Sequence, residues 1–99
     1  MVKLRIIIDD AAGQSLKEAY NYIKKDSLQN AQKVVSEIRD SFKQLAEKPL
    51  LHAPDKYRLD KNPSFRAYEI HKYRISYHVG DSEIRIIRIR HTKMNPLDY

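Results

Sequence analysis

The sequence predicts an α+β domain in which a helical hairpin packs on one face of a small, mainly antiparallel four-stranded sheet. An alternating apolar run begins the chain, two apolar stripes with helical spacing follow, and three β-rich runs come last. Both helices have a stripe to bury and the sheet has one apolar face to offer, so we expect them to pack together. The predicted order is β-α-α-β-β-β in a single domain, residues 1–99.

The first strand is predicted over residues 2–8, where the even positions are all apolar. Two helices follow, over residues 12–25 and 28–48. Apolar residues recur at helical spacing in both: Leu16, Ala19, Tyr20 and Ile23 in the first, and Ala31, Val34, Val35, Ile38, Phe42 and Leu45 in the second. Ser27 is placed to cap the second helix and Pro49 to end it. The short turn between them predicts an antiparallel helical hairpin.

Residues 50–64 are predicted to connect the helices to the sheet, because prolines and alternating charges break any period. A basic cluster lies inside this connector: Lys56, Arg58 and Lys61. We interpret the cluster as part of a solvated loop; the alternative is that it flanks a binding groove.

Three strands are predicted within residues 65–93, with turns at His71-Lys72 and at residues 80–82. In the middle strand the odd positions 73–79 are apolar, whereas Arg74 and its alternate neighbours are polar. The last strand changes phase between Ile86 and Ile87, which indicates either a β-bulge or a central strand buried on both faces. The sheet face opposite the helices should be open and basic.

The charge of the chain favours an acidic partner, either nucleic acid or protein. The net charge is +6 and the pI is about 9.6. Residues 66–93 hold seven Lys or Arg against three acids, so they carry +4 of that charge. The absence of cysteine excludes disulfides and thiolate chemistry. The histidines lack metal-ligand spacing and no apolar run reaches 18 residues, so we predict no metal, no cofactor and no membrane partner.

Several stretches in this order resemble the RelE/ParE superfamily of toxins from type II toxin–antitoxin systems. Residues 16–49, with Tyr20-Asn21-Tyr22-Ile23 and the run that ends at Pro49, resemble the helical hairpin of that family. Residues 66–79, with Tyr73-Arg74-Ile75-Ser76-Tyr77, resemble its central strands, and residues 86–93 resemble its last strand.

The resemblance implies a cytoplasmic toxin that is neutralised by a cognate acidic antitoxin. RelE-like members cleave messenger RNA on the ribosome without a metal ion, whereas ParE-like members inhibit DNA gyrase and need no nuclease site. We expect ribosome-dependent mRNA cleavage, with gyrase inhibition as the first alternative. A degenerate, non-toxic basic binding module is the second alternative.

The nuclease hypothesis assigns roles to seven candidate residues. As implied by the resemblance, Arg74 would bind the scissile phosphate, His91 would act as acid or base, Lys93 would stabilise charge and Tyr99 would contact a base. Candidate substrate-binding residues are Arg66, His71 and Arg90, and Glu69 and His71 are further candidates for the acid or the base. The structural alternatives are that Arg74 pairs with Glu69 or Asp81 and that His91 is a half-buried packing residue. The lysine pair expected in the first strand of a RelE-like hairpin is missing, which weakens the nuclease hypothesis.

Overall fold

The computed structural model describes residues 4–93, and its order of elements confirms the predicted β-α-α-β-β-β. The elements are β1 (Arg5–Ile8), α1 (Asp10–Lys24), α2 (Leu28–Glu47), β2 (Phe65–Ile70), β3 (Tyr73–Val79) and β4 (Glu83–His91). The helix α1 begins two residues earlier than the periodicity predicts. The cap of α2 is as predicted, because the Ser27 hydroxyl accepts a 3.0 Å hydrogen bond from the Asn30 N–H.

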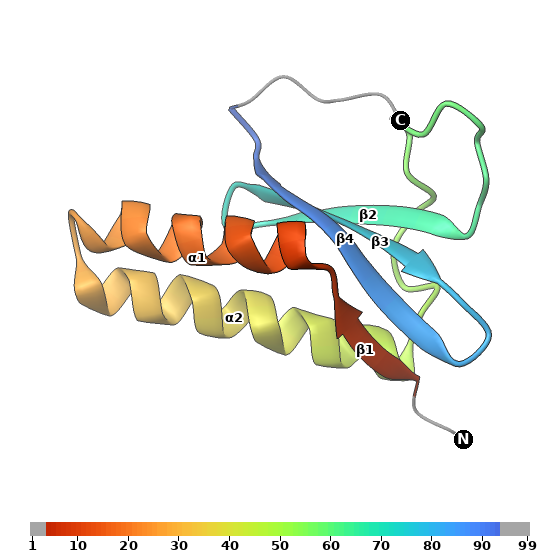
Figure 1. The fold of residues 1–99 in the computed structure, drawn as a ribbon, viewed down its shortest axis with the longest axis horizontal. Helices are drawn as coiled ribbons and strands as arrows, with labels where there is room; N and C mark the ends of the chain where they lie inside the picture. The colour runs from red at the N-terminus through yellow and green to blue at the C-terminus, as the bar shows by residue number, and fades with distance from the viewer. Residues whose placement is uncertain (1–3, 94–99) are drawn as a thin grey trace.

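The four strands form one sheet in the order β1-β4-β3-β2 (Figure 1). The strand β1 runs parallel to β4, and the other two pairings are antiparallel. The two helices lie side by side against one face, where they bury the apolar side of the strands. The fully buried residues there include Ile38 and Leu45 of α2 and Tyr77 of β3. The α+β class and the mainly antiparallel sheet are therefore confirmed.

A β-bulge resolves the change of phase in the last strand. The residue opposite Tyr77 is Ile86, but the residue opposite Ser76 is Arg88, so Ile87 is the extra residue of β4. After the bulge, the apolar residues return to the helix-covered face. That face receives Ile84, Ile86 and Ile89, whereas the opposite face receives Arg85, Arg88 and Arg90. The strand β4 is central as well, but arginines rather than apolar residues occupy its second face.

The connector between α2 and β2 wraps around the free edge of β2. Its first part lies on the helix side, where the Tyr77 hydroxyl donates to the Pro49 carbonyl at 3.0 Å. Its middle part follows β2: Pro54 bridges to Arg66, and the Asp55 N–H donates to the Phe65 carbonyl at 2.8 Å. The backbone groups of this edge are thereby partly paired, which protects it from pairing with another chain.

The last part of the connector crosses the sheet face opposite the helices. We call residues 55–64 the strap. Contacts of Asp55 and Tyr57 with Arg74, and of Arg58 with Phe65, hold the strap against this face. The expectation of an open face is wrong here, because a long-range ion pair attaches the loop to the sheet. The interpretation of the basic cluster as solvated holds for Lys56 and Lys61, which are exposed, but not for Arg58, which is half-buried. Neither helix in the described part of the chain has the length and hydrophobicity to cross a bilayer.

Candidate functional site

The strongest candidate from the sequence, Arg74, lies on the strap-covered face with its guanidinium engaged. Its Nη2 donates to Asp55 Oδ1 at 2.7 Å, and its Nη1 lies 3.9 Å from Glu69 Oε2. The Tyr57 ring lies against the same guanidinium, with 4.6 Å from the carbon to the ring centroid. The Asp55 side chain is fully buried and that of Arg74 is 18% exposed. A pair this well buried holds its partners firmly, because either charge alone would be costly.

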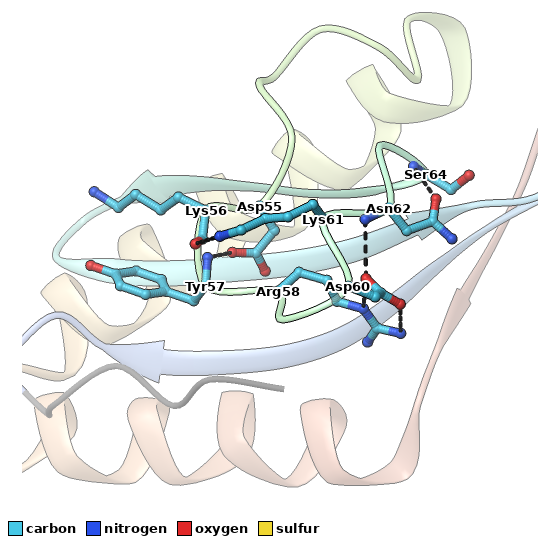
Figure 2. A network of polar contacts seen from close by, with 8 residues as sticks. All are labelled: Asp55, Lys56, Tyr57, Arg58, Asp60, Lys61, Asn62 and Ser64. Atoms are coloured by element: carbon cyan, nitrogen blue, oxygen red, sulfur yellow. Dashed lines mark hydrogen bonds and ion pairs between the residues drawn. The ribbon is translucent and has the colours of Figure 1, made fainter.

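Hydrogen bonds between side chains and nearby backbone groups define the conformation of the strap (Figure 2). Three side chains accept hydrogen bonds from the backbone two residues ahead: Asp55 from Tyr57 at 3.0 Å, Asp60 from Asn62 at 3.0 Å and Asn62 from Ser64 at 2.9 Å. Such local bonds fix a turn without regular secondary structure. The strap therefore delivers the Asp55 carboxylate to a defined place on the sheet.

The three side chains of the basic cluster predicted in the connector do not stay together in the strap. Arg58 turns inward, where its guanidinium lies 3.5 Å from the Phe65 ring centroid and its Nε donates to Asp60 Oδ1 at 3.0 Å. The hydrogen bond from Arg58 lowers the pKa of the Asp60 carboxyl, with further help from the Asn62 N–H. Lys56 and Lys61 stay exposed, and the Lys61 ammonium donates to the Lys56 carbonyl at 3.2 Å.

A row of arginines on β4 extends the basic face beyond Arg74. Arg90 is the direct cross-strand neighbour of Arg74, so the sheet brings these two predicted site residues together. Arg85 donates to Asp9 at 2.7 Å and to Glu83 at 3.1 Å, and these bonds raise the pKa of its guanidinium. Residues 55–93 hold ten Lys or Arg against five acids, whereas residues 4–54 hold eight against seven. The excess positive charge of the described chain thus lies in the strap and the sheet.

The other predicted catalytic residues do not meet Arg74. His91 is paired with Tyr73, which is buried under the helices, and the two rings contact edge to face with centroids 5.1 Å apart. His91 therefore lies on the helix side, and its Nδ1 accepts a 3.0 Å hydrogen bond from the Lys93 N–H. Lys93 follows the end of β4 and is exposed. Tyr99 lies outside the described residues.

Two of the predicted substrate-binding residues also lie away from Arg74. Arg66 shares the helix-side face with Tyr77, and its Nη1 donates to the His52 carbonyl at 2.7 Å. His71 lies in the β2–β3 turn, where it and Lys72 have positive φ angles of 51° and 68°. Its Nε2 lies 3.2 Å from Glu37 Oε2, so it ties the turn to α2. Only Arg74 and Arg90, of the six predicted site residues that the structure describes, share one face as neighbours.

Asp55 is the functional residue that sequence analysis misses. It lies 19 positions from Arg74, in a connector without periodicity, and no local pattern indicates which arginine it reaches. Glu69, which the sequence does name as a partner of Arg74, is present as the weaker second contact. The sequence gives no signal that separates Asp55 from Asp60, the other acid between Pro54 and Pro63.

This arrangement brings two carboxylates to Arg74, those of Asp55 and Glu69, but none of the predicted histidines. The nearest histidine on the same face, His78, is four positions further along β3, about 13 Å away at the usual rise of a strand. Its ring packs on Phe65, with centroids 4.6 Å apart. Within residues 4–93, no three His, Asp or Glu side chains are grouped closely enough to hold a metal ion.

A groove lies on the helix side of the sheet, between the two helices and the edge strand β1. This groove of about 650 Å³ has an apolar floor and a polar rim with two basic residues and one acid, and Lys43 lies 3.6 Å from that acid, Asp40. The floor includes Ile6, Ile8, Val35 and Phe42, and the rim includes Arg39, Asp40 and Lys43. The half-buried isoleucines of β1 stay accessible here because β1 pairs on one side only, with β4.

The fold is that of toxins from toxin–antitoxin systems. A chain of the chromosomal ParDE system from P. aeruginosa superposes with a TM-score of 0.70 and 22% identity, over 90% of this chain and 96% of that one. The RelBE2 toxin–antitoxin complex from Mycobacterium tuberculosis gives 0.64 and 17%, over 91% and 99%, and the YoeB dimer from Staphylococcus aureus gives 0.58 and 22%, over 90% and 97%. At these identities the similarity establishes the fold alone.

The family follows from the sequence itself. Residues 6–96 match the family model described as the ParE toxin of the type II toxin–antitoxin system parDE. The chain therefore belongs to the ParE toxin family, within the RelE/ParE superfamily that the sequence analysis predicts. No curated protein matches the chain in sequence.

Proposed function

We propose that this toxin arrests growth as an inhibitor of DNA gyrase and not by cleaving messenger RNA. The observation that carries the proposal is the disposition of Arg74 and His91. The guanidinium is occupied by the buried Asp55 carboxylate, and the imidazole lies on the other face of the sheet. The match to the ParE family model supports the same choice, because ParE-like toxins are the gyrase-directed branch implied by the resemblance.

The chemistry of RNA cleavage explains why this disposition matters. Attack by a 2′-hydroxyl needs a base near that hydroxyl, an acid near the leaving oxygen and cations around the phosphate, all within hydrogen-bond reach of one substrate. Two groups on opposite faces of a sheet cannot serve the same phosphate. Inhibition of a protein target needs only a complementary surface and no catalytic group. Ribosome-dependent cleavage stays a prediction and is the competing outcome of the test.

The partner that would restrain this toxin is a cognate acidic antitoxin, and the groove beside β1 is its proposed docking site. An amphipathic acidic segment could bury apolar side chains against Val35 and Phe42 while its carboxylates meet Arg39 and Lys43. Both proposed partners, antitoxin and gyrase, act in the cytoplasm, which is therefore the proposed location.

Two assays on the purified protein separate the proposed targets. We expect a titration to block supercoiling of relaxed plasmid by gyrase, while primer extension on ribosome-bound message shows no new cuts. The variant Arg74→Lys keeps a charge for Asp55 but loses the planar fork that grips phosphate. Growth arrest on induction should therefore survive in Arg74→Lys if the target is gyrase. Message cuts in the ribosomal A site that vanish in Arg74→Lys, together with normal supercoiling, would establish the nuclease instead.

The groove assignment has its own test. Val35→Asp places a like charge beside the predicted acidic segment, so it should weaken binding of the co-expressed antitoxin by at least tenfold. The matched control is Leu51→Asp, on an exposed leucine outside the groove. Equal affinity of Val35→Asp and Leu51→Asp for the antitoxin would exclude the groove.

A further inference from the structure

Two arginines stand directly opposite each other on the strap-covered face. Arg74 of β3 is paired with Arg90 of β4, and like charges in that position repel each other. The nearest acid on the neighbouring strand, Glu69, is mostly exposed and lies 3.9 Å from Arg74. Within the sheet, Glu69 therefore offers Arg74 a carboxylate only at the long distance of 3.9 Å.

The strap brings a second anion from outside the sheet. Asp55 Oδ1 accepts from Arg74 Nη2 at 2.7 Å and from the Tyr57 N–H at 3.0 Å. The backbone of Asp55 is fixed on both sides, because its N–H donates to the Phe65 carbonyl at 2.8 Å and its carbonyl accepts from the Arg58 N–H at 3.3 Å. A buried carboxylate oxygen thus accepts from one guanidinium N–H of Arg74 and from one backbone N–H, and the Tyr57 ring lies against the same guanidinium.

These donors are the ones that proteins use for phosphate. A guanidinium N–H and a loop N–H that point at one oxygen suit a phosphate oxygen as well as a carboxylate oxygen. A tetrahedral phosphate group could accept the same two hydrogen bonds if the Asp55 side chain were absent. The bonds that fix the backbone of Asp55, from its N–H to the Phe65 carbonyl and from the Arg58 N–H to its own carbonyl, do not involve the carboxylate, so they can remain when the side chain is removed.

We infer that Asp55 is a built-in anion that fills a phosphate site formed by Arg74 and the Tyr57 N–H, beside Arg90. While the strap is seated, this face does not take up a phosphate group, whether free or in a nucleic-acid backbone. The inference extends the proposed function, because it gives a residue that keeps the toxin from binding RNA at this face. Its test reads phosphate binding rather than gyrase activity, so either proposal can fail without the other.

The test removes the carboxylate and offers phosphate in its place. Thermal unfolding of Asp55→Ala is followed with and without inorganic phosphate, at an ionic strength held constant with chloride. We expect a saturable rise in Tm of about 4–8 °C at a phosphate concentration about five times the dissociation constant. Asp60→Ala is the matched control, because Asp60 accepts the same kind of backbone hydrogen bond in the same loop and pairs with Arg58, not Arg74. Wild type and Asp60→Ala should show no saturable rise.

Two further variants keep the inference falsifiable. In Asp55→Ala with Arg74→Met, the phosphate response should disappear. Asp55→Asn keeps the shape of the side chain and should show a weaker response than Asp55→Ala, because the amide still fills the site. Equal phosphate responses in Asp55→Ala, Asp60→Ala and wild type would overturn the inference. So would the failure of both Asp55 variants to fold in saturating phosphate, since the site would then not accept a substitute anion.

A second arm distinguishes the source of the phosphate group. A labelled single-stranded RNA of twelve nucleotides is titrated into Asp55→Ala and wild type at low salt. Binding that is at least tenfold tighter in Asp55→Ala and that is lost with Arg74→Met indicates a phosphodiester ligand. A response to inorganic phosphate without that difference indicates a closed site that admits only the free ion, and it still supports the built-in anion.

Discussion

Different interactions attach the segments that cover the two faces of the sheet. On the helix side, many apolar side chains contribute to the packing. Fully buried examples are Ile38, Leu45, Tyr77 and Ile86. On the strap side, the buried pair of Asp55 and Arg74 holds a loop without regular structure. Burial of apolar surface is non-directional and spread over many contacts, whereas an ion pair depends on one geometry. Substitutions on the helix side should therefore lower stability in proportion to the atoms removed. On the strap side, loss of one partner of the ion pair should be enough to release the strap.

The largest effect is expected from the helix side. Ile86→Ala removes a fully buried side chain and should lower the free energy of unfolding by about 2–5 kcal/mol, measured by urea denaturation. Ile87→Ala is the control, because Ile87 is the half-buried residue of the bulge. Equal losses in the two variants would mean that the bulge does not divide β4 as described.

The next effect tests the strap side. Asp55→Ala leaves the Arg74 guanidinium without its closest partner and should cost about 3 kcal/mol in the absence of phosphate. Asp60→Ala removes an ion pair whose carboxylate is 52% exposed, and should cost much less. If urea denaturation gives the same small loss for both, the strap is not held by Asp55.

A smaller effect is expected where a polar contact joins the helix and the sheet. The Tyr68 and Ser41 hydroxyls are 2.6 Å apart, and burial raises the pKa of the Tyr68 phenol to about 12. Tyr68→Phe removes this hydrogen bond and should cost about 1 kcal/mol. In a spectrophotometric titration the variant should lack the tyrosine that ionises last. An unchanged titration curve would show that Tyr68 ionises like an exposed tyrosine.

The smallest effect is a dependence on pH near the connector. The His52 ring stacks on Tyr68 with centroids 4.1 Å apart, and burial lowers the pKa of its imidazole below the usual 6.5. The neutral ring is therefore favoured in the folded state. This contribution is fully present above pH 6.5 and is lost as the pH falls through the folded pKa. His52→Phe keeps a stacked ring that cannot be protonated. Lowering the pH from 7.5 to 5 should therefore reduce the free energy of unfolding of wild type more than that of His52→Phe. A constant difference would contradict the burial effect.

The sequence predicts the two faces unequally well, for a physical reason. Helical and strand periods report which residues are buried, so the order of elements, the hairpin and the polar face of Arg74 follow from them. The phase break at Ile86-Ile87 leaves it undecided which face of the sheet His91 lies on, because a bulge moves every later residue to the other face. The partner of Arg74 follows from no period at all. Only the path of the connector around β2 brings Asp55 to it, and sequence analysis offered Glu69 and Asp81 instead.

The coupling between Asp55 and Arg74 holds the strap against the sheet, and a double-mutant cycle measures this coupling directly. The cycle compares the unfolding free energies of wild type, Asp55→Ala, Arg74→Met and the double variant. We predict a coupling of about 2–3 kcal/mol, with the double variant nearly as stable as either single one. A parallel cycle of Glu69→Ala with Arg74→Met should give under about 1 kcal/mol, because Glu69 is mostly exposed. A coupling below about 0.5 kcal/mol between Asp55 and Arg74 would contradict the account, since Arg74 would then be available to a substrate.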